Sequence, residues 1–497
     1  MSSGKIKISI MDAATNELTD ARVQIKDSKG KYHYPKGTTP YKRDVHFTTT
    51  GSFELKLPSG NAFILIEKGK EFGAIESVID VVKGRTKNLM FQLERWIDMN
   101  SLGWYSGDLH VHRPLEHMKH LMRAEDLNVA PVLTIWNERV LWRKRPVPDE
   151  KVVQFDGVRA YGQFAQEDER NGGAVLLFNL KSMIQFEEIT PYYPPNLAFC
   201  REARSQGALI EQEKPIWWEA PVNVALGLVD TIGIVNNHVQ RREIMDNEAW
   251  GRPRDKEKYP GPLGFVLYNL DLYYHYLNLG IKIPISAGSA SGVLRNPLGY
   301  NRLYVQLKGE FNYLDWLIAM KEGKSFATNG PMLFCRVDEK EPFTTFASDA
   351  TSYKGIMDVS IKAQDPLDRV ELVVNGKIHE SMQVKGIKTA FETKFNLDLD
   401  SSYWVAARVF EKNEHTVRFA HSNPFFIELE KPYEPVLESA LFYEGWCKDL
   451  LSNFRNKRLE HENDKRLTSM HEKLDEIEAI YLEALKFYEN LKFPAMK

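Results

Sequence analysis

Short alternations of apolar and polar residues dominate both the first hundred positions and the stretch from about residue 337. Alternation at every second position is typical of strands with one buried face. In residues 1–97 the runs are KIKISI, ARVQIKD, SFELKL, AFILIEKG and NLMFQL. In residues 337–430 they are MDVSIKAQ, RVELVVNGK, FETKFNL, YWVAARVFE and FFIEL. We therefore predict one β-sandwich domain at 1–97 and another at 337–430.

The middle of the chain repeats a different unit: an apolar helix, a glycine, a short strand and a polar cluster. Predicted helices at 197–205, 220–228, 263–279 and 313–322 are each followed by such a strand. Alternating helices and strands are typical of a parallel sheet or barrel, whose active site lies at the carboxyl ends of the strands. We therefore expect residues 98–336 to form a distorted β/α barrel, which makes the whole chain an α/β multidomain protein.

Residues 431–497 are predicted to be a helical tail. Apolar positions there follow a three-four spacing. The seam consists of Leu467, Met470, Leu474, Ile477, Tyr481, Ala484, Tyr488 and Leu491. Two interpretations are open: the helix docks on its own chain, or it joins copies into a homo-oligomer. If the helix joins copies, the protein could be a structural or assembly protein, which is one functional hypothesis beside the enzyme and the binding protein considered below.

The stretch GWYSGDLHVHRPLEHM, residues 103–118, carries the candidate chemistry. In an extended chain, successive side chains point to opposite faces. Asp108, His110 and His112 would then share one face, with Leu109 and Val111 on the other. Neutral imidazole is the commonest protein ligand for metal ions. This pattern predicts one wall of a metal site.

YSGDLHVH resembles the first motif of the PHP (polymerase and histidinol phosphatase) superfamily, and is most similar to its carbaryl-hydrolase-like (CehA/McbA-type) metallohydrolases. Further phrases with this resemblance are LMRAEDLNV, EDERNGGAVLLFNL, EKPIWWEAP, VDTIGIVNNH, SAGSASGVLRNPLGYNRLYV, GKSFATNGPML and RFAHSNPFF. The resemblance implies a distorted β/α barrel flanked by β-domains and hydrolysis that depends on a divalent metal. Separately, DAATNELTDARVQIKDSKGK resembles transthyretin-like or carboxypeptidase-regulatory-like modules.

The chain departs from this family at three motifs. The family's TDHN is Thr134-Ile135-Trp136-Asn137 here, and its His-Pro motif is Glu213-Lys214-Pro215. Its closing Gly-Ser-Asp-Ala-His is Gly288-Ser289-Ala290-Ser291-Gly292. Isoleucine and tryptophan cannot replace metal ligands, so these positions cannot assemble the family's full two- or three-metal centre.

The remaining residues suit a single divalent ion, with Zn, Mn and Fe all compatible. The predicted ligands are His110, His112, Glu167, Glu213 and His238. Structural alternatives stay open: His238 would be a core histidine, and Glu213 would lie beside a simply solvated Lys214. Of Glu167 and Glu169, one would ligate and the other would pair with Arg170. Asp108 is expected behind the ligands, where it would hold a histidine tautomer.

The implied reaction is attack by a metal-activated water on an ester, amide, carbamate or phosphoester. Glu169 or Glu213 is the predicted general base. Arg139 or Asn329 is the predicted group that stabilises the developing oxyanion.

A non-catalytic protein that binds a small molecule or a glycan is the main alternative. Aromatic residues are dense near the predicted strand ends, where they form either core or a stacking wall for a planar or sugar ligand. They are Trp136, Trp142, Trp217, Trp218, Tyr192 and Tyr193. Convergence of the imidazoles of His110, His112 and His238 would favour the enzyme.

The amino-acid composition further limits the classes of partner that we expect. In the 497 residues, 65 Lys and Arg nearly balance 68 Asp and Glu, so no basic bias indicates nucleic acid. No long apolar run predicts a membrane span, and the N-terminus lacks the apolar core of a signal peptide. The protein is therefore expected to be cytoplasmic, or exported if a leader has been removed. Only Cys200, Cys335 and Cys447 occur, which argues against a disulfide framework and a cysteine-type zinc site.

Overall fold

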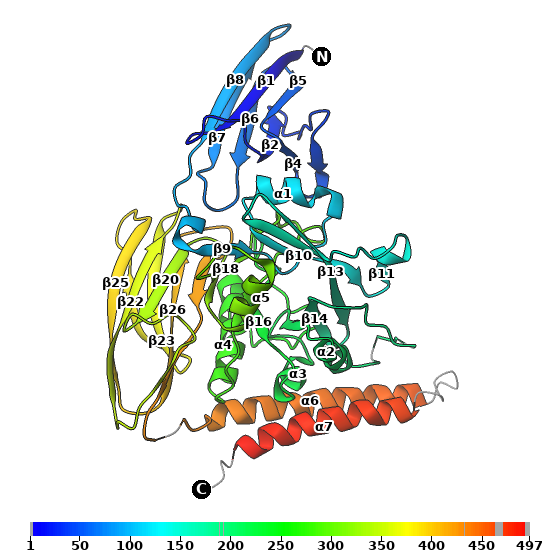
Figure 1. Cartoon of the computed structure of the whole chain (residues 1–497), viewed down its shortest axis with the longest axis vertical. Coiled ribbons are helices and arrows are strands. Elements are labelled where there is room, and N and C mark those ends of the chain that lie inside the picture. The colour runs from blue at the N-terminus through cyan, green and yellow to red at the C-terminus, as the bar shows by residue number, and fades with distance from the viewer. Residues whose placement is uncertain (1–2, 188, 192, 432, 463–470, 493–497) are drawn as a thin grey trace.

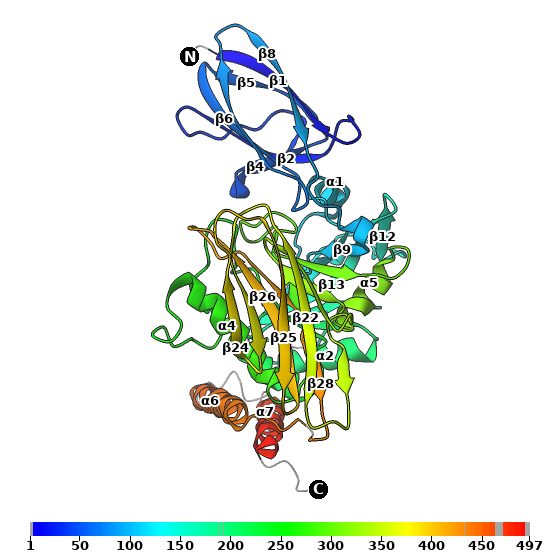
Figure 2. The same cartoon turned by 90° about the vertical axis from the view of Figure 1, so that its left-hand side faces the viewer.

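The computed structural model describes residues 3–187, 189–191, 193–431, 433–462 and 471–492. Strands hold 39% of the chain and helices 21%. Figure 1 shows an N-terminal β-sandwich at the top, a mixed middle region below it, a C-terminal β-sandwich at one side and a pair of helices underneath. Figure 2 turns the C-terminal sandwich toward the viewer. The candidate ligands all come from the middle region.

The N-terminal sandwich packs two sheets around a core of its own, with strand orders β5-β1-β8 and β3-β4-β2-β6-β7. In β1 the side chains of Ile6, Ile8 and Ile10 are buried while their neighbours face outward, as a strand with one buried face requires. Its strands are β1 (Ser3–Asp12), β2 (Ala21–Asp27), β3 (Thr39–Tyr41), β4 (His46–Thr49), β5 (Ser52–Pro58), β6 (Gly60–Glu67), β7 (Ile75–Val81) and β8 (Thr86–Leu93).

The middle region contains the predicted helices and strands. Its strands are β9 (Trp104–Gly107), β10 (Val129–Trp136), β11 (Arg139–Val140), β12 (Val152–Phe155), β13 (Arg159–Arg170), β14 (Gly173–Phe178), β15 (Leu209–Gln212), β16 (Thr231–Val235), β17 (Ile285–Ala287), β18 (Arg302–Gln306) and β19 (Ser325–Thr328). Its α-helices are α1 (Met118–Ala124), α2 (Asn196–Ser205), α3 (Ala220–Ala225), α4 (Gly261–Leu277) and α5 (Tyr313–Lys321). Its short 3₁₀ turns are η2 (Asn100–Leu102), η3 (Leu115–His117) and η4 (Leu141–Arg143), while η1 (Lys42–Asp44) belongs to the N-terminal sandwich.

The predicted β/α barrel is wrong. Strand β10 is parallel to β9 and β13, and β15, β16 and β17 are parallel to one another. Strand β14, however, is antiparallel to both β13 and β15, and β18 is antiparallel to both β9 and β19. The same sheet continues from β19 into β27 of the C-terminal part. The middle region is therefore a mixed sheet inside a β-rich protein, and not a PHP-type ring of parallel β/α units.

The C-terminal sandwich packs sheet β20-β22-β25 against β23, β24, β26, β27 and β28. Its core also takes in Trp104, Tyr304 and Phe326 from the middle region, so these two parts share one hydrophobic cluster. Its strands are β20 (Met332–Val337), β21 (Thr345–Ala347), β22 (Tyr353–Lys362), β23 (Leu367–Val374), β24 (Lys377–Gln383), β25 (Ala390–Leu399), β26 (Tyr403–Glu411), β27 (Phe419–Ser422) and β28 (Phe425–Glu428).

Helices α6 (Leu437–Glu462) and α7 (His471–Leu491) lie side by side beneath α3 and α4 (Figure 1). The predicted seam is buried within the chain at Leu474, Ile477, Tyr481, Ala484 and Tyr488. Its first two members, Leu467 and Met470, lie outside the described residues. The seam therefore docks on its own protein, and self-association stays a prediction.

None of the described helices combines the length and apolar character that a membrane span requires. Cys200, Cys335 and Cys447 are all free and buried.

Candidate metal centre

His110 and His112 lie just beyond β9, in a segment that stays extended. Between them Val111 bridges Val132 on one side and Ser291 on the other. Leu109 and Val111 are fully buried, so the two histidines share the opposite face, as the alternation predicted. Their Nε2 atoms lie 3.1 Å apart. Both imidazoles therefore present the same nitrogen to one point.

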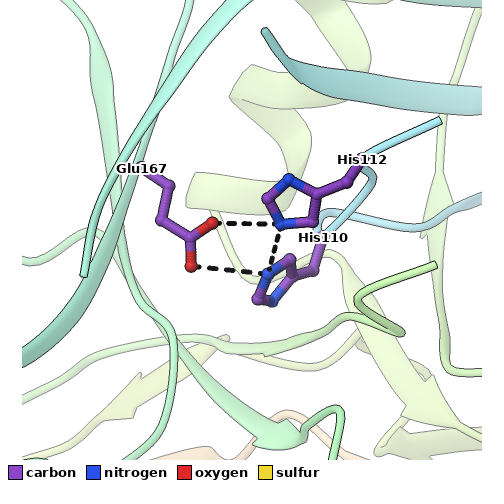
Figure 3. A group of neighbouring side chains, drawn as sticks. All are labelled: His110, His112 and Glu167. Atoms are coloured by element: carbon purple, nitrogen blue, oxygen red, sulfur yellow. Dashed lines mark hydrogen bonds and ion pairs between the residues drawn. The ribbon is translucent and has the colours of Figure 1, made fainter. Parts of the chain in front are cut away.

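Glu167, on β13, faces the two histidines across β10, which lies between their segment and β13 (Figure 3). Its Oε1 lies 3.4 Å from His110 Nε2, and its Oε2 lies 3.1 Å from His112 Nε2. Strand β13 pairs in parallel with β10, which brings Glu167 opposite Trp136 at the end of β10. The fold thus places all three side chains at one end of adjacent strands.

The three residues could hold a metal ion. One ligand atom from each lies within 4.8 Å of the others. Two ligands about 2.1 Å from one ion are separated by about 3.0 to 3.4 Å, depending on the angle between them. The observed separations of 3.1 to 3.4 Å match that range. Glu167 Oε2 is buried; among the described residues it has the ion pair with His112 Nε2 but no well-formed hydrogen bond, as expected of a ligand oxygen.

The charges of the two histidines and the nearby carboxylates shift one another's pKa values. Burial lowers the pKa of His110, but the carboxylates of Glu167 and Glu213 outweigh burial and raise that pKa well above its ordinary value. Burial lowers the pKa of His112. Burial would raise the pKa of Glu167, yet the two histidines hold it well below its ordinary value. Metal binding must displace the proton from His110, because only the neutral ring has a free lone pair on Nε2.

Glu213 does not join the ligand atoms but lies behind them. Its Oε1 is 3.3 Å from His110 Nδ1, the nitrogen that points away from the centre. Lys214 Nζ donates to both of its oxygens at 2.9 and 2.6 Å, and Trp217 Nε1 donates to Oε2 at 2.9 Å. Burial raises the pKa of Glu213, but Lys214 and His110 lower it to about 2. Glu213 thus carries out the orienting role that we predicted for Asp108.

We expect Glu213→Gln to weaken metal binding about 10- to 100-fold, the usual cost of losing the carboxylate behind a ligating histidine. The amide cannot supply the negative charge that orients His110, so the ring loses its fixed tautomer. Competition with a chromophoric chelator would measure the affinity. An unchanged metal affinity would show that Glu213 does not support the metal site.

The Asp108 carboxylate accepts hydrogen bonds from backbone N–H groups and not from an imidazole. Its Oδ1 accepts from the backbone N–H of His110 and of Ser289, at 3.1 and 2.9 Å, and its Oδ2 accepts from the N–H of Gly299 at 2.8 Å. It is completely buried. Asp108 therefore fixes the histidine strand to the loop that follows β17, which corrects its predicted role.

Gly288, in that loop, packs directly against His110. A Cβ added at Gly288 would lie 2.6 Å from His110 Cβ and 3.1 Å from its backbone nitrogen. We expect Gly288→Ala to push the ring off its position and weaken metal binding at least about tenfold, because coordination demands a narrow geometry. Gly309→Ala is the matched control, since a Cβ there meets nothing within 4 Å. The same chelator competition decides the outcome, and equal affinities in the two variants would contradict this packing argument.

Glu169 shares the inward face of β13 with Glu167, two residues away. Trp136 Nε1 donates to its Oε2 at 3.0 Å. Asn137 clamps its backbone: Asn137 Oδ1 accepts from the Glu169 N–H at 2.9 Å, and Asn137 Nδ2 donates to the Glu169 carbonyl at 2.6 Å. Burial raises the pKa of Glu169 to about 7, with Glu167 adding to the shift. Arg170 pairs with Asp168 and not with a glutamate.

His238 and Asn329 do not meet the centre, contrary to prediction. His238 Nδ1 donates to the carbonyl of Asn247 at 2.9 Å, and its ring stacks on Phe265. Burial lowers the pKa of His238 to about 3, so the ring is a neutral core histidine. Asn329 holds the backbone of Val417 and Phe419 by two hydrogen bonds of 2.8 Å and lies at the C-terminal sandwich.

A cleft of about 620 Å³ opens beside His112. Arg139 lines it and stacks over the ring of Trp136 at 4.6 Å. The charged residues of the cleft are Arg113, Glu116, Glu138, Arg139, Arg143, Lys144 and Arg145. Cations thus outnumber carboxylates where a substrate would approach His112.

Sequence reasoning missed Glu211 and the roles of Trp136 and Asn137. Glu211 is buried on β15, and Ser286 Oγ donates to its Oε1 at 2.6 Å. Burial raises the pKa of Glu211 to about 8, which leaves a neutral carboxylic acid behind the centre. Its position two residues before Glu213 in the strand run ALIEQ was the available signal.

Comparisons with known proteins do not assign a family. No protein-family model matches the chain, and no curated protein matches it. Among solved structures, the minor pilin GBS52 of Streptococcus agalactiae is 14% identical with a TM-score of 0.17, over 20% of this chain and 46% of that one. A 3-chlorocatechol 1,2-dioxygenase from Rhodococcus opacus 1CP is 13% identical with a TM-score of 0.14, over 19% of this chain and 60% of that one. The Bacillus anthracis TIE protein is 9% identical with a TM-score of 0.15, over 87% of this chain and 51% of that one. This chain therefore spans about half the length of these proteins, and the similarity carries no functional argument.

Proposed function

We propose that this protein is a metal-dependent hydrolase that cleaves an ester, carbamate, amide or phosphoester bond. The observation that carries the proposal is the convergence of His110, His112 and Glu167 at one buried point. Three nitrogen and oxygen ligands leave coordination positions open, as catalytic sites require, and suit Zn, Mn or Fe. Such an ion, when bound, makes a water nucleophilic near neutral pH and polarises the bond under attack.

Glu169 supplies the proton-accepting group. Trp136 holds its Oε2, which leaves Oε1 to take a proton from water on the face that it shares with Glu167. Asn137 fixes the backbone at this position, so the carboxyl group keeps one orientation during the reaction. The base is thus held by Trp136 and Asn137, the last two residues of the TIWN stretch.

Arg139 is a cation that faces the cleft and acts electrostatically on His112. It lines the cleft beside His112 and is kept over Trp136 by a cation–π contact. There its guanidinium group would hold an oxygen of the substrate that gains negative charge. The surplus of cations in the cleft favours substrates that carry negative charge or a strongly polarised oxygen.

We expect Glu169→Gln to retain the metal and to lower kcat about 10²- to 10⁴-fold, the usual contribution of a positioned general base. The measurement is turnover of a panel of p-nitrophenyl esters, carbamates and phosphodiesters by metal-loaded protein, with a chelated sample beside it. Glu76→Gln is the matched control, because Glu76 is exposed on β7 of the N-terminal sandwich.

A metal-loaded protein that turns over no member of the panel would contradict the proposed function. If it bound such compounds without cleaving them, the binding-protein alternative would be favoured. Equal turnover by Glu169→Gln and the parent would be consistent with a hydrolase, but it would show that Glu169 is not the general base.

A further inference from the structure

A second charged site lies away from the candidate metal centre, where the N-terminal sandwich, the middle region and the C-terminal sandwich meet. It is a cavity of about 60 Å³, with room for about four water-sized groups. Lys70 reaches it from the loop after β6, Tyr300 and Arg302 from the start of β18, and Glu411 and Arg418 from the turn between β26 and β27.

Part of the lining is already paired. Arg22 joins Glu67 and Glu125 at 2.7 Å each, and Arg241 binds the second oxygen of Glu67 at 2.5 Å. These two cations and two carboxylates balance one another. They form a neutral wall on the side of the N-terminal sandwich.

The other wall carries excess positive charge. Arg302 is fully buried and donates to backbone carbonyls, among them that of Asp126 at 3.0 Å; it has no salt bridge among the described residues. Lys70 donates to the Asn329 carbonyl at 2.6 Å and lies 4.0 Å from the Tyr300 ring centre. Arg418 reaches Asp365 outside the cavity and lies 3.7 Å from Glu411. Burial, reinforced by Arg418 and Arg302, lowers the pKa of Lys70 well below its ordinary value, as expected where cations crowd together.

Three polar atoms here lack a hydrogen-bond partner within the described chain. They are the hydroxyl of Tyr300, Nε of Arg418 and Oε2 of Glu411. Tyr300 is only 4% exposed, so its hydroxyl group cannot be satisfied by bulk water. Buried donors without acceptors cost free energy, and most such groups in proteins have a partner. Tyr300, Arg418 and Glu411 lie against one another here without well-formed hydrogen bonds. A partner that satisfied all three would accept from two donors, carry negative charge and donate to a carboxylate.

We propose that this junction cavity binds a small tetrahedral oxyanion that keeps a proton, of the hydrogenphosphate class. Its oxygens would accept from Tyr300, Arg418 and Lys70, and its hydroxyl would donate to Glu411. Sulfate has the same shape but lacks that hydroxyl at neutral pH, so it should bind more weakly. The anion would neutralise the excess positive charge of the second wall, where three parts of the chain meet.

The test is isothermal titration calorimetry of the full chain with inorganic phosphate, sulfate and phenyl phosphate at constant ionic strength. We expect one site per chain with phosphate tighter than sulfate. Lys70→Met should weaken phosphate binding about 10- to 100-fold, as loss of a charge-assisted hydrogen bond does. Tyr300→Phe, which removes one unpartnered hydroxyl and little else, should weaken it at least about threefold. Lys354→Met is the control, because that lysine is 77% exposed on β22.

A His110→Ala/His112→Ala background separates this cavity from the metal centre. Phosphate binding that persists in that background and falls with Tyr300→Phe supports the proposal. Phenyl phosphate bound as tightly as phosphate would identify a phosphoryl group on a larger molecule as the ligand, and rejection of phenyl phosphate would identify the free anion. No phosphate binding, or binding that depends on the histidines and ignores Tyr300→Phe, would overturn it.

Discussion

Replacing His110 and His112 together by alanine should remove the metal ion and lower hydrolysis at least about a thousandfold. Both ligands present Nε2 to one point, and the remaining Glu167 cannot hold a divalent ion alone. Loss of the ion removes several kcal/mol of transition-state stabilisation, and each 1.36 kcal/mol is a factor of ten in rate. Elemental analysis and turnover on the same samples would measure both effects.

His379→Ala is the matched control for this double variant, because His379 is an exposed histidine on β24, far along the C-terminal sandwich. We expect about one equivalent of metal in the parent and in the control, and none in the double variant. Metal retained at the parental level in the double variant would place the ion elsewhere.

Tyr488→Ala should destabilise the fold by about 3–5 kcal/mol, the range for deleting a fully buried aromatic ring. Tyr488 is completely buried, its ring stacks on Tyr443, and its hydroxyl donates to the Pro221 carbonyl at 2.7 Å. Nearby, Tyr481 donates to Glu219 of the middle region. Since whole proteins are stable by only about 5–15 kcal/mol, this loss would be a large fraction. Urea unfolding followed by tryptophan fluorescence would measure it.

Two further variants sharpen this result. Leu482→Ala, at a position 43% exposed on the same helix, should stay within about 0.5 kcal/mol of the parent. Tyr488→Phe should cost about 1–3 kcal/mol, since it leaves the Pro221 carbonyl buried without its donor. If Tyr488→Ala were as mild as Leu482→Ala, helix α7 would not be docked as described.

The local elements of the middle region could be predicted, but their pairing could not. Periodicity located the helices at 197–205, 263–279 and 313–322, which the structure confirms as α2, α4 and α5 within a few residues. It does not specify whether neighbouring strands run parallel. Asn171 and Gly172 form a two-residue connection between β13 and β14, and Asn-Gly is the strongest short signal of an antiparallel hairpin. Attention to that dipeptide would have excluded the parallel barrel.

The metal ligands could be predicted from the sequence because period-two alternation determines which residues share a face of a strand. It placed His110 with His112, and the same rule pairs Glu167 with Glu169 on β13. Alternation cannot say on which side of an imidazole a distant carboxylate lies. The sequence therefore predicts Glu213 as a ligand, whereas the structure puts it against His110 Nδ1. The same limit applies to His238 and Asn329, whose positions depend on loops that periodicity does not describe.

The most direct test of the metal site is anomalous diffraction from crystals of the metal-loaded protein, recorded on both sides of the absorption edge of the ion. We expect one anomalous peak within about 2.0–2.2 Å of His110 Nε2, His112 Nε2 and a Glu167 oxygen. Crystals loaded with stoichiometric metal that show no peak at this point, or show their peak at other ligands, would contradict it.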